Sequence, residues 1–212
     1  METKLSNTFV TADSKYKHEC RALILKAIMD KFPIHNSLNT VTLGGEGLKM
    51  EMLLEKFYDL KGVSYEFNTV SVEKARQNAP EGVTIVHDNI FNHQYKGCEQ
   101  FIWFDFTTAL RYENVSQLLN WIQNNPITSE CVFAVTYTLH SRHKEGEGYR
   151  QLFDSEVEHD AFIEDMANYI GMYLDNEYID VDSHISITKY CNIDIDKRSL
   201  PMVQFIFKIN RK

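Results

Sequence analysis

The chain has 212 residues, of which 43% are hydrophobic and 25% are charged, and this balance indicates one globular domain. Its formal net charge of −8 excludes a global positive field that would hold nucleic acid non-specifically, although a local basic patch is compatible with it. No apolar run approaches the length of a membrane-spanning helix, and the first residues lack the apolar core of a secretory signal. The four cysteines are far apart and form no Cys-x-x-Cys pair, so we expect reduced thiols in a cytoplasmic protein: Cys20, Cys98, Cys131 and Cys191.

Apolar periodicity and turn residues predict helices and strands that alternate along most of the chain. The expected helices cover residues 15–32, 46–60, 70–79, 113–124 and 151–174. The expected strands cover residues 40–44, 63–67, 83–86, 101–104 and 131–137, followed by two β-rich stretches at 178–190 and 202–209. This alternation favours right-handed crossovers and a mostly parallel sheet, while the closing order of helix, strand and strand indicates a terminal hairpin with an antiparallel strand.

We expect a single domain over residues 1–212, in which residues 1–35 form an N-terminal helical extension. Residues 1–14 are polar and expected to be irregular. The helix expected at 15–32 is rich in lysine and arginine within an acidic protein. Its basic side chains form either an ordinary solvated face or a surface that contacts phosphate groups.

A glycine-rich turn follows the first expected strand. The β-branched and apolar residues 41–43 lead into Gly44, Gly45 and Gly47, and a helical pattern begins after them. A strand, a glycine turn and a helix in this order bind the phosphate or carboxylate end of nucleotide-like ligands in α/β proteins, because glycine lets the backbone approach the ligand. The same pattern also occurs as a tight turn without a ligand.

Acidic residues are expected at the ends of the next three strands: Glu66, then Asp88 with Asn89, then Asp105. In open α/β sheets ligands bind beyond the carboxyl ends of the strands, so these residues share a rim with the glycine turn. Glu66 lies 66 − 47 = 19 residues after Gly47, close to the offset of about 20 at which an acid meets ribose hydroxyls. Singly, each residue also fits a solvated turn, but together they favour a nucleoside-containing ligand.

These segments resemble the class I S-adenosylmethionine-dependent methyltransferases. Residues 42–47 (Thr-Leu-Gly-Gly-Glu-Gly) are similar to the first motif of that family, residues 65–79 to the second, residues 86–90 to the third and residues 101–105 to the fourth. The resemblance implies a Rossmann-like three-layer α/β sandwich, with a mostly parallel seven-stranded sheet and an antiparallel C-terminal strand. It also implies S-adenosylmethionine as the cofactor, bound by residues that the motifs place around it: Gly44, Gly45, Glu46, Gly47, Glu66, Asp88 and Asn89.

The sequence departs from the family pattern in two places. The first motif usually carries an acid two residues before the first glycine, where this chain has Thr42. Glu46 either takes the place of that acid or repels the carboxylate of the cofactor's methionine part. The fourth motif lacks both the Asn/Asp-Pro-Pro-Tyr element of enzymes that methylate exocyclic amines of bases and the Pro-Cys of cytosine C5 enzymes, which disfavours those two substrate classes.

Asp105 is the expected catalytic residue, because it lies at the rim where a methyl acceptor would bind; the alternative is a turn or N-cap acid. A ribose 2′-O enzyme would use a Lys-Asp-Lys-Glu set, with Asp105 second and lysines drawn from Lys31, Lys144 and Lys189. The basic loop at 139–150 either contacts phosphate or is an ordinary surface loop. No metal site is expected, since His140 and His143 lack acidic or cysteine partners.

The sequence therefore favours a methyltransferase whose acceptor is unresolved, with nucleic acid preferred over a small molecule. The alternative is a methyltransferase-like subunit that has lost catalysis and serves as a binding or scaffold protein. A nicotinamide-dependent oxidoreductase is disfavoured, because the turn lacks the Gly-x-Gly-x-x-Gly pattern. The sequence makes no prediction about the oligomeric state.

Overall fold

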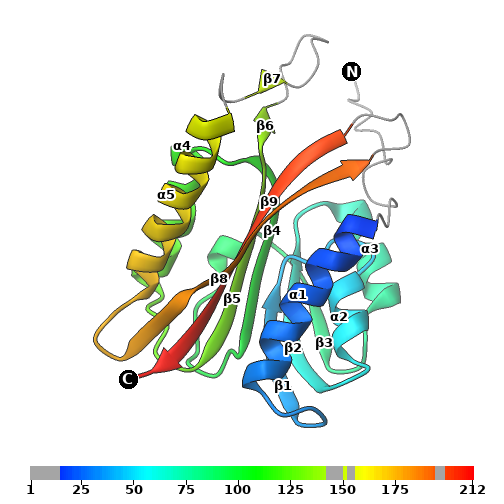
Figure 1. Ribbon diagram of the computed structural model, residues 1–212. Helices are drawn as coiled ribbons and strands as arrows, with labels where there is room; N and C mark the ends of the chain where they lie inside the picture. The colour runs from blue at the N-terminus through cyan, green and yellow to red at the C-terminus, as the bar shows by residue number, and fades with distance from the viewer. Residues whose placement is uncertain (1–14, 142–149, 152–155, 194–198) are drawn as a thin grey trace.

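A seven-stranded sheet between two layers of helices organises the chain (Figure 1). The computed structural model describes residues 15–141, 150–151, 156–193 and 199–212. The helices are α1 (Lys15–Lys31), α2 (Lys49–Leu54), α3 (Thr69–Asn78), α4 (Tyr112–Asn124), α5 (Glu156–Leu174) and the 3-10 helix η2 (Ile90–Asn92). The strands are β1 (Ser37–Thr42), β2 (Asp59–Glu66), β3 (Val83–His87), β4 (Phe101–Ala109), β5 (Cys131–Thr138), β6 (His140–Ser141), β7 (Arg150–Gln151), β8 (Ile179–Ile193) and β9 (Ser199–Arg211). Helices α1, α2 and α3 cover one face of the sheet, and α4 and α5 cover the other.

The strand order of the large sheet is β3-β2-β1-β4-β5-β9-β8. The pairs β3–β2, β2–β1, β1–β4 and β4–β5 are parallel, whereas β9 is antiparallel to both of its neighbours, β5 and β8. The expected three-layer α/β sandwich, with a mostly parallel seven-stranded sheet and an antiparallel C-terminal strand, is confirmed. The order reverses between β1 and β4, so those two strands flank the point where α/β proteins bind their ligands.

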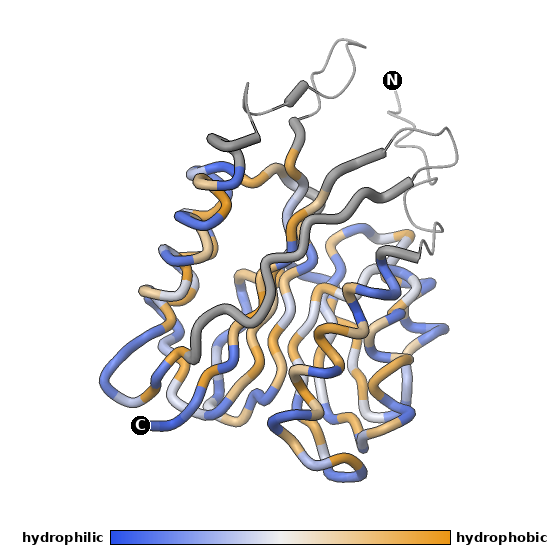
Figure 2. The backbone as a smooth tube through the Cα atoms, viewed as in Figure 1, coloured by the Kyte–Doolittle hydropathy of each residue, from blue (hydrophilic) through white to orange (hydrophobic). Residues whose placement is uncertain are grey.

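The two faces of the sheet bury separate apolar clusters. The face under α4 and α5 carries alternate residues of β4, β5 and β9, such as Phe104, Phe133 and Phe205, and the face under α1–α3 carries Trp103 and Ile206. Figure 2 shows hydrophobic residues concentrated along the strands and on the sides of the helices that face them. Helix α4 buries the side chains that the sequence pattern selects: Val115, Leu118, Leu119 and Ile122.

The prediction of a helix over 46–60 is wrong. Helix α2 covers only Lys49–Leu54, and β2 begins at Asp59, four residues before the expected start of the strand at 63. Gly62 lies within β2, where it pairs with Thr40 of β1, and does not end an element as predicted. The position needs glycine because a Cβ there would be 2.1 Å from the Oγ1 atom of Thr40. The expected sheet-facing side chain of Met52 is instead 39% exposed.

The end of the chain follows the expected order with different bounds. The described part of α5 begins at Glu156, within the expected helix 151–174, and residues 152–155 lie outside the description. The small antiparallel pair β6–β7 is not predicted by the sequence. The expected irregular segment 1–14 and residues 194–198 of the polar connection between the last two strands also lie outside the described residues. None of the helices within the described ranges combines the length and apolar character needed to cross a bilayer.

Candidate functional site

The sequence-predicted site residues lie at one edge of the sheet, where the parallel strands β1 to β4 end. Gly44 follows β1, Glu66 is the last residue of β2, Asp88 follows the end of β3, and Asp105 is the middle residue of β4. The strands are neighbours in the order β3-β2-β1-β4, and their parallel register aligns these ends. The fold therefore brings together the glycine turn and the three acids, as the parallel topology predicts.

The glycine turn packs closely against β2 and α2. The backbone N–H of Gly44 donates to the hydroxyl oxygen of Ser64 at 3.2 Å. A Cβ on Gly44 would lie 2.3 Å from the Oε1 atom of Glu51 and 2.8 Å from the Ser64 hydroxyl, so no larger residue fits there unless its neighbours move. Gly45 has a φ of 62°, and Leu48, which is fully buried, also adopts a left-handed conformation, with φ 44° and ψ 40°. A left-handed leucine costs roughly 1–2 kcal/mol, so the packing around the turn must hold it in place.

Glu46 is drawn toward α3. Its carboxylate forms an ion pair with Lys74 at 3.0 Å, and its backbone carbonyl accepts a hydrogen bond from the Asn78 side chain at 3.0 Å. Opposite charges this close compensate each other, which weakens the repulsion that a ligand carboxylate would meet at the turn. These contacts connect the glycine turn directly to the helix that follows β2.

Glu51 is a buried acid of this site that the sequence reasoning missed. Its side chain has no solvent exposure, and its Oε1 atom accepts a hydrogen bond from the Thr42 hydroxyl. Burial raises the pKa of the Glu51 carboxyl, and hydrogen bonds from Thr42 and Ser64 oppose that rise. A signal was present in the sequence, since position 51 is three residues from Leu48 and from Leu54, both of which are buried.

Glu66 is partly buried at the end of β2. Its Oε1 atom accepts a hydrogen bond from the backbone N–H of Asn68 at 2.8 Å. Asn68 in turn caps α3, because its side chain accepts from the backbone N–H groups of Val70 and Ser71 at 2.9 and 3.2 Å. The start of α3 thereby fixes the position of Glu66 at the rim.

Asp88 and Asn89 shape the turn that follows β3. The Oδ1 atom of Asp88 accepts hydrogen bonds from the backbone N–H of Asn89 at 2.7 Å and from the Asn92 side chain at 2.8 Å. The side chain of Asn89 accepts from the N–H of Phe91 at 3.1 Å. Both residues are exposed, and both form the turn that leads into η2. The turn-forming interpretation is therefore confirmed, and the contact with adenine stays a prediction.

Asp105 lies within β4, so the interpretation as an N-cap or turn acid is wrong. Its side chain is partly buried, and burial raises the pKa of this carboxyl from 3.8 to about 6. The positive charges of Lys17 and Arg21 on α1 and a hydrogen bond with Thr136 on β5 lower the pKa, while the neighbouring Glu51 raises it further. Asp105 and Glu51 thus form a pair of interacting acids beside the glycine turn.

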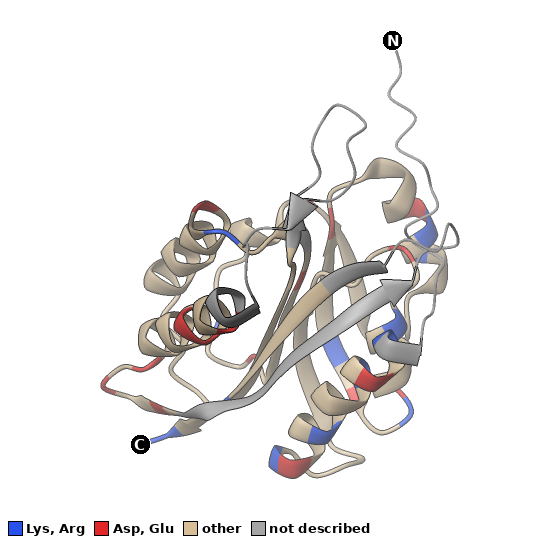
Figure 3. Cartoon of the chain, turned by 45° about the horizontal axis from the view of Figure 1, so that its top comes forward, with Lys and Arg blue, Asp and Glu red and all other residues tan. Residues whose placement is uncertain are grey.

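Helix α1 lies over the Asp105 side of the site. The Cys20 thiol on this helix is buried, and burial together with the Asp105 charge raises its pKa to about 12. Acidic as well as basic side chains lie along α1 (Figure 3), so the helix does not present a uniformly basic face. At its far end Asp30 pairs with Lys208 at 3.1 Å.

The structure tests only one of the expectations about basic residues. Lys31 lies at the opposite edge of the sheet, 2.6 Å from Asn210 near the end of β9, so it cannot belong to a catalytic set with Asp105. Most of the basic loop expected at 139–150, including Lys144 and His143, lies outside the described residues, and so does the side chain of Lys189. Within the described ranges, no group of three or more His, Cys, Asp or Glu could hold a metal ion.

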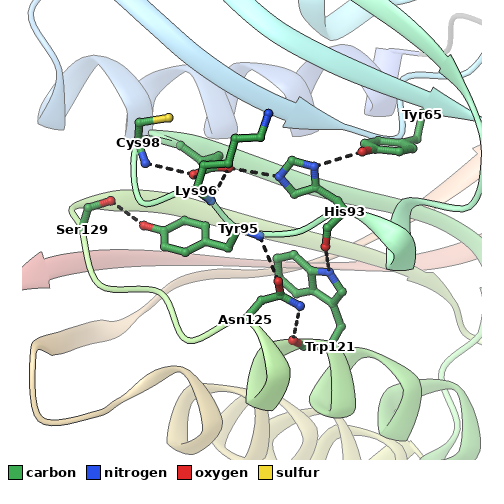
Figure 4. Close-up of polar contacts among 9 residues, drawn as sticks. Tyr65, His93, Tyr95, Lys96, Cys98, Trp121, Asn125 and Ser129 are labelled. Carbon is green, nitrogen blue, oxygen red and sulfur yellow. Dashed lines mark hydrogen bonds and ion pairs between the residues drawn. The ribbon is translucent and has the colours of Figure 1, made fainter.

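A buried polar network joins the end of β2 to the segment between β3 and β4 (Figure 4). The hydroxyl of Tyr65 contacts Nδ1 of His93 at 3.0 Å, and Nε2 of His93 contacts Oε1 of Glu99 at 3.1 Å. The carboxylate of Glu99 also accepts from the backbone N–H groups of Lys96 and Cys98, at distances of 2.9 to 3.1 Å. Burial raises the pKa of Glu99, but the hydrogen bonds outweigh it and leave the pKa lowered. The network ties the end of β2 to the segment between β3 and β4, and no periodic sequence pattern indicates it.

Comparisons with known proteins place this fold. No family model matches the sequence, and none of the curated proteins matches it. Among solved structures, the N-methyltransferase NodS from Bradyrhizobium japonicum WM9 in complex with S-adenosyl-l-homocysteine aligns over 95% of this chain and 93% of its own, with a TM-score of 0.54 and 9% identity. An rRNA methylase from Streptococcus thermophilus aligns over 93% and 98% (TM-score 0.51, 10% identity), and a SAM-dependent methyltransferase from Leishmania major aligns over 91% and 73% (TM-score 0.52, 11% identity). The chain therefore has the fold of the class I methyltransferases.

Proposed function

We propose that this chain is a cytoplasmic S-adenosylmethionine-dependent methyltransferase that acts as a single domain, with residues 1–35 as an N-terminal helical extension. The observation that carries the proposal is the gathering of the glycine turn and the acids Glu66, Asp88 and Asp105 at one edge of a methyltransferase-type sheet. NodS, which shares this fold, was solved with the cofactor product S-adenosyl-l-homocysteine.

Each part of the cofactor has a proposed partner at this edge. Residues 44–47 receive the amino acid end, where glycines permit close approach of the backbone. Glu66 accepts from the ribose hydroxyls; a carboxylate has about four lone-pair sites, so its bond from Asn68 leaves capacity for both. Asp88 and Asn89 contact the adenine. The acids also suit the positive charge of the sulfonium, which the cofactor brings as the methyl donor.

Asp105 is the proposed catalytic residue. The acceptor's nucleophilic atom forms a bond to the methyl carbon as the carbon–sulfur bond breaks, and an acceptor O–H or N–H gives up its proton. A carboxyl whose pKa is about 6 is well suited to take that proton near neutral pH, because general bases act best when their pKa is close to the working pH. The main contribution of the protein is to hold acceptor and donor in line.

Nucleic acid is the preferred class of acceptor, with a small molecule as the second. An rRNA methylase from Streptococcus thermophilus shares this fold over 98% of its own chain, which supports RNA as one candidate acceptor. The net charge of −8 predicts that any nucleic-acid binding depends on local contacts near the rim rather than on a general positive field.

Calorimetry with S-adenosylhomocysteine tests the cofactor assignment. The wild type should bind at micromolar concentration, and Glu66→Ala should weaken binding at least about tenfold, the loss of roughly 1.4 kcal/mol expected for a carboxylate that bonds the ribose. Glu73→Gln, which changes an exposed acid on α3, is the matched control and should bind like the wild type. No heat at millimolar ligand would refute the cofactor assignment.

Transfer of a labelled methyl group tests the activity. The labelled cofactor is incubated with total RNA, DNA, protein and small metabolites, and label is expected in RNA. Asp105→Asn should then reduce turnover much more than affinity for the cofactor; equal losses in both would show that Asp105 is not the catalytic residue.

A second candidate function is a methyltransferase-like scaffold subunit without catalysis. One observation favours it: Thr42 stands where the family has an acid. Cofactor binding without transfer to any of the four pools would support this function over the first.

A further inference from the structure

The acid that the first motif lacks on β1 has a counterpart on the neighbouring helix. Thr42 holds the motif position, and its hydroxyl donates to the carboxyl of Glu51, which α2 places directly beneath Gly44. Glu46, the substitute considered from the sequence, instead pairs with Lys74. A buried carboxyl is thus present beside the turn, but a helix residue nine positions after Thr42 supplies it.

Glu51 also organises the second contact of the turn. Its carboxyl interacts with the hydroxyl of Ser64, and the oxygen of that hydroxyl accepts the N–H of Gly44 at 3.2 Å. A serine hydroxyl that donates to a carboxyl presents its lone pairs to other donors, so Glu51 sets the orientation in which Ser64 can hold Gly44. Removing the carboxyl would leave both hydroxyls, Thr42 and Ser64, without this partner.

The arrangement is costly for the fold, which argues that it serves more than packing. Glu51 is fully buried, and in the described part of the chain its Oε2 atom has no hydrogen-bond partner. An unsatisfied buried polar atom costs roughly 1–3 kcal/mol. The adjacent left-handed Leu48 adds strain, and such strain concentrates where a backbone must be held in one conformation for a ligand.

We propose that Glu51 is the positioning residue of the glycine turn: its buried carboxyl, carried by α2, fixes residues 44–48 through Thr42 and Ser64 in the conformation that receives the amino acid end of the cofactor. This inference rests on the proposed function for its ligand. It predicts that the carboxyl is needed at this place in the fold, whichever position of the chain carries it.

Four variants separate positioning from simple packing. Glu51→Gln keeps the shape and removes the carboxylate, and Glu55→Gln is the control at the C-terminal cap of the same helix, where the side chain is exposed. Glu51→Ala removes the group altogether, and Thr42→Asp combined with Glu51→Ala returns a carboxyl from the strand. We expect Glu51→Gln to weaken S-adenosylhomocysteine binding about 10- to 100-fold in calorimetry and Glu55→Gln to leave it unchanged. The double variant should recover at least tenfold of the affinity lost in Glu51→Ala.

Amide hydrogen exchange of the ligand-free proteins gives a readout that does not depend on the cofactor. In Glu51→Gln the amides of residues 44–48 should exchange at least tenfold faster than in Glu55→Gln, while those of β5 stay unchanged. Equal exchange in these two variants, or equal affinity of both for S-adenosylhomocysteine, would overturn the inference, as would a double variant that binds no better than Glu51→Ala. If the wild type does not bind S-adenosylhomocysteine, the proposed function fails, and the exchange rates alone decide whether Glu51 holds the turn. If Glu51→Ala does not fold, the near-isosteric Glu51→Gln still provides both readouts.

Discussion

Asp105→Asn should make the protein more stable at neutral pH. The pKa of this carboxyl rises from 3.8 to about 6 on folding, mainly because the side chain loses contact with water. A tenfold change in acidity corresponds to about 1.4 kcal/mol, so the ionised carboxylate lowers the free energy of unfolding by up to about 3 kcal/mol. Water reaches part of the side chain, which makes this figure an upper limit.

The sign of the effect depends on pH in a defined way. The folded protein binds the Asp105 proton more tightly than the unfolded chain, so the destabilisation is absent below pH 3.8 and develops as the pH rises to about 6. Asparagine carries no charge, and the gain in stability of Asp105→Asn should therefore be near zero at pH 4 and greatest above pH 6.

Urea and thermal unfolding of wild type and Asp105→Asn at pH 4 and pH 7.5 measure this gain. At pH 7.5 the melting temperature should rise by up to roughly 6–12 °C, the range that corresponds to about 3 kcal/mol in a chain of this size. Asp59→Asn, which changes an exposed aspartate on β2, is the control and should behave like the wild type at both pH values. A difference between Asp105→Asn and wild type that is the same at pH 4 and pH 7.5 would refute the reasoning.

Three further predictions concern stability. Glu99→Gln should lower the free energy of unfolding at pH 7 by about 1.5–3 kcal/mol. The loss should shrink as the pH falls below 4.5, because the lowered pKa of Glu99 stabilises the fold only where the carboxylate is ionised. A loss of stability that persists in acid would contradict this reasoning. Gly62→Ala should cost about 1–3 kcal/mol in urea unfolding, since its Cβ would lie 2.6 Å from the backbone oxygen of Thr40, whereas Gly47→Ala, with its nearest atom at 3.5 Å, should be nearly neutral. Tyr137→Phe should raise the free energy of unfolding by about 1 kcal/mol, and with it the melting temperature, because the buried hydroxyl of Tyr137 has no hydrogen-bond partner among the described residues. A lower melting temperature than that of the wild type would indicate that the hydroxyl has a partner.

The order of elements was predictable because most of them carry strong periodic patterns. Helix α4 shows apolar residues at helical spacing and buries them, and the continuous apolar run of β5 is buried throughout. The region around α2 was not predictable, because the pairing of β2 with β1 overrides the local pattern. Gly62 looks like the end of an element in the sequence, but it lies inside β2, where its close approach to Thr40 leaves no room for a side chain.

The candidate site divides in the same way. The shared edge of Glu66, Asp88 and Asp105 follows from parallel topology alone, so the sequence was sufficient for it. The burial of Glu51 and the contacts of His93 depend on side chains from separate segments meeting in space, which periodicity does not indicate. The pairing of Glu46 with Lys74 belongs to the same class, since the two residues are 28 positions apart.

The position of β9 in the sheet bears on how the chain folds during its synthesis. This strand follows all the others in the sequence, yet it lies between β5 and β8 and supplies Val203, Phe205 and Phe207 to the core under α4 and α5. At a translation rate of about 5–20 residues per second, β1 to β5 leave the ribosome several seconds earlier. Until β9 emerges, β8 has no strand to pair with and the apolar side of α5 is incompletely covered. The nascent chain should therefore depend on chaperones most strongly between the release of β5 and the release of β9.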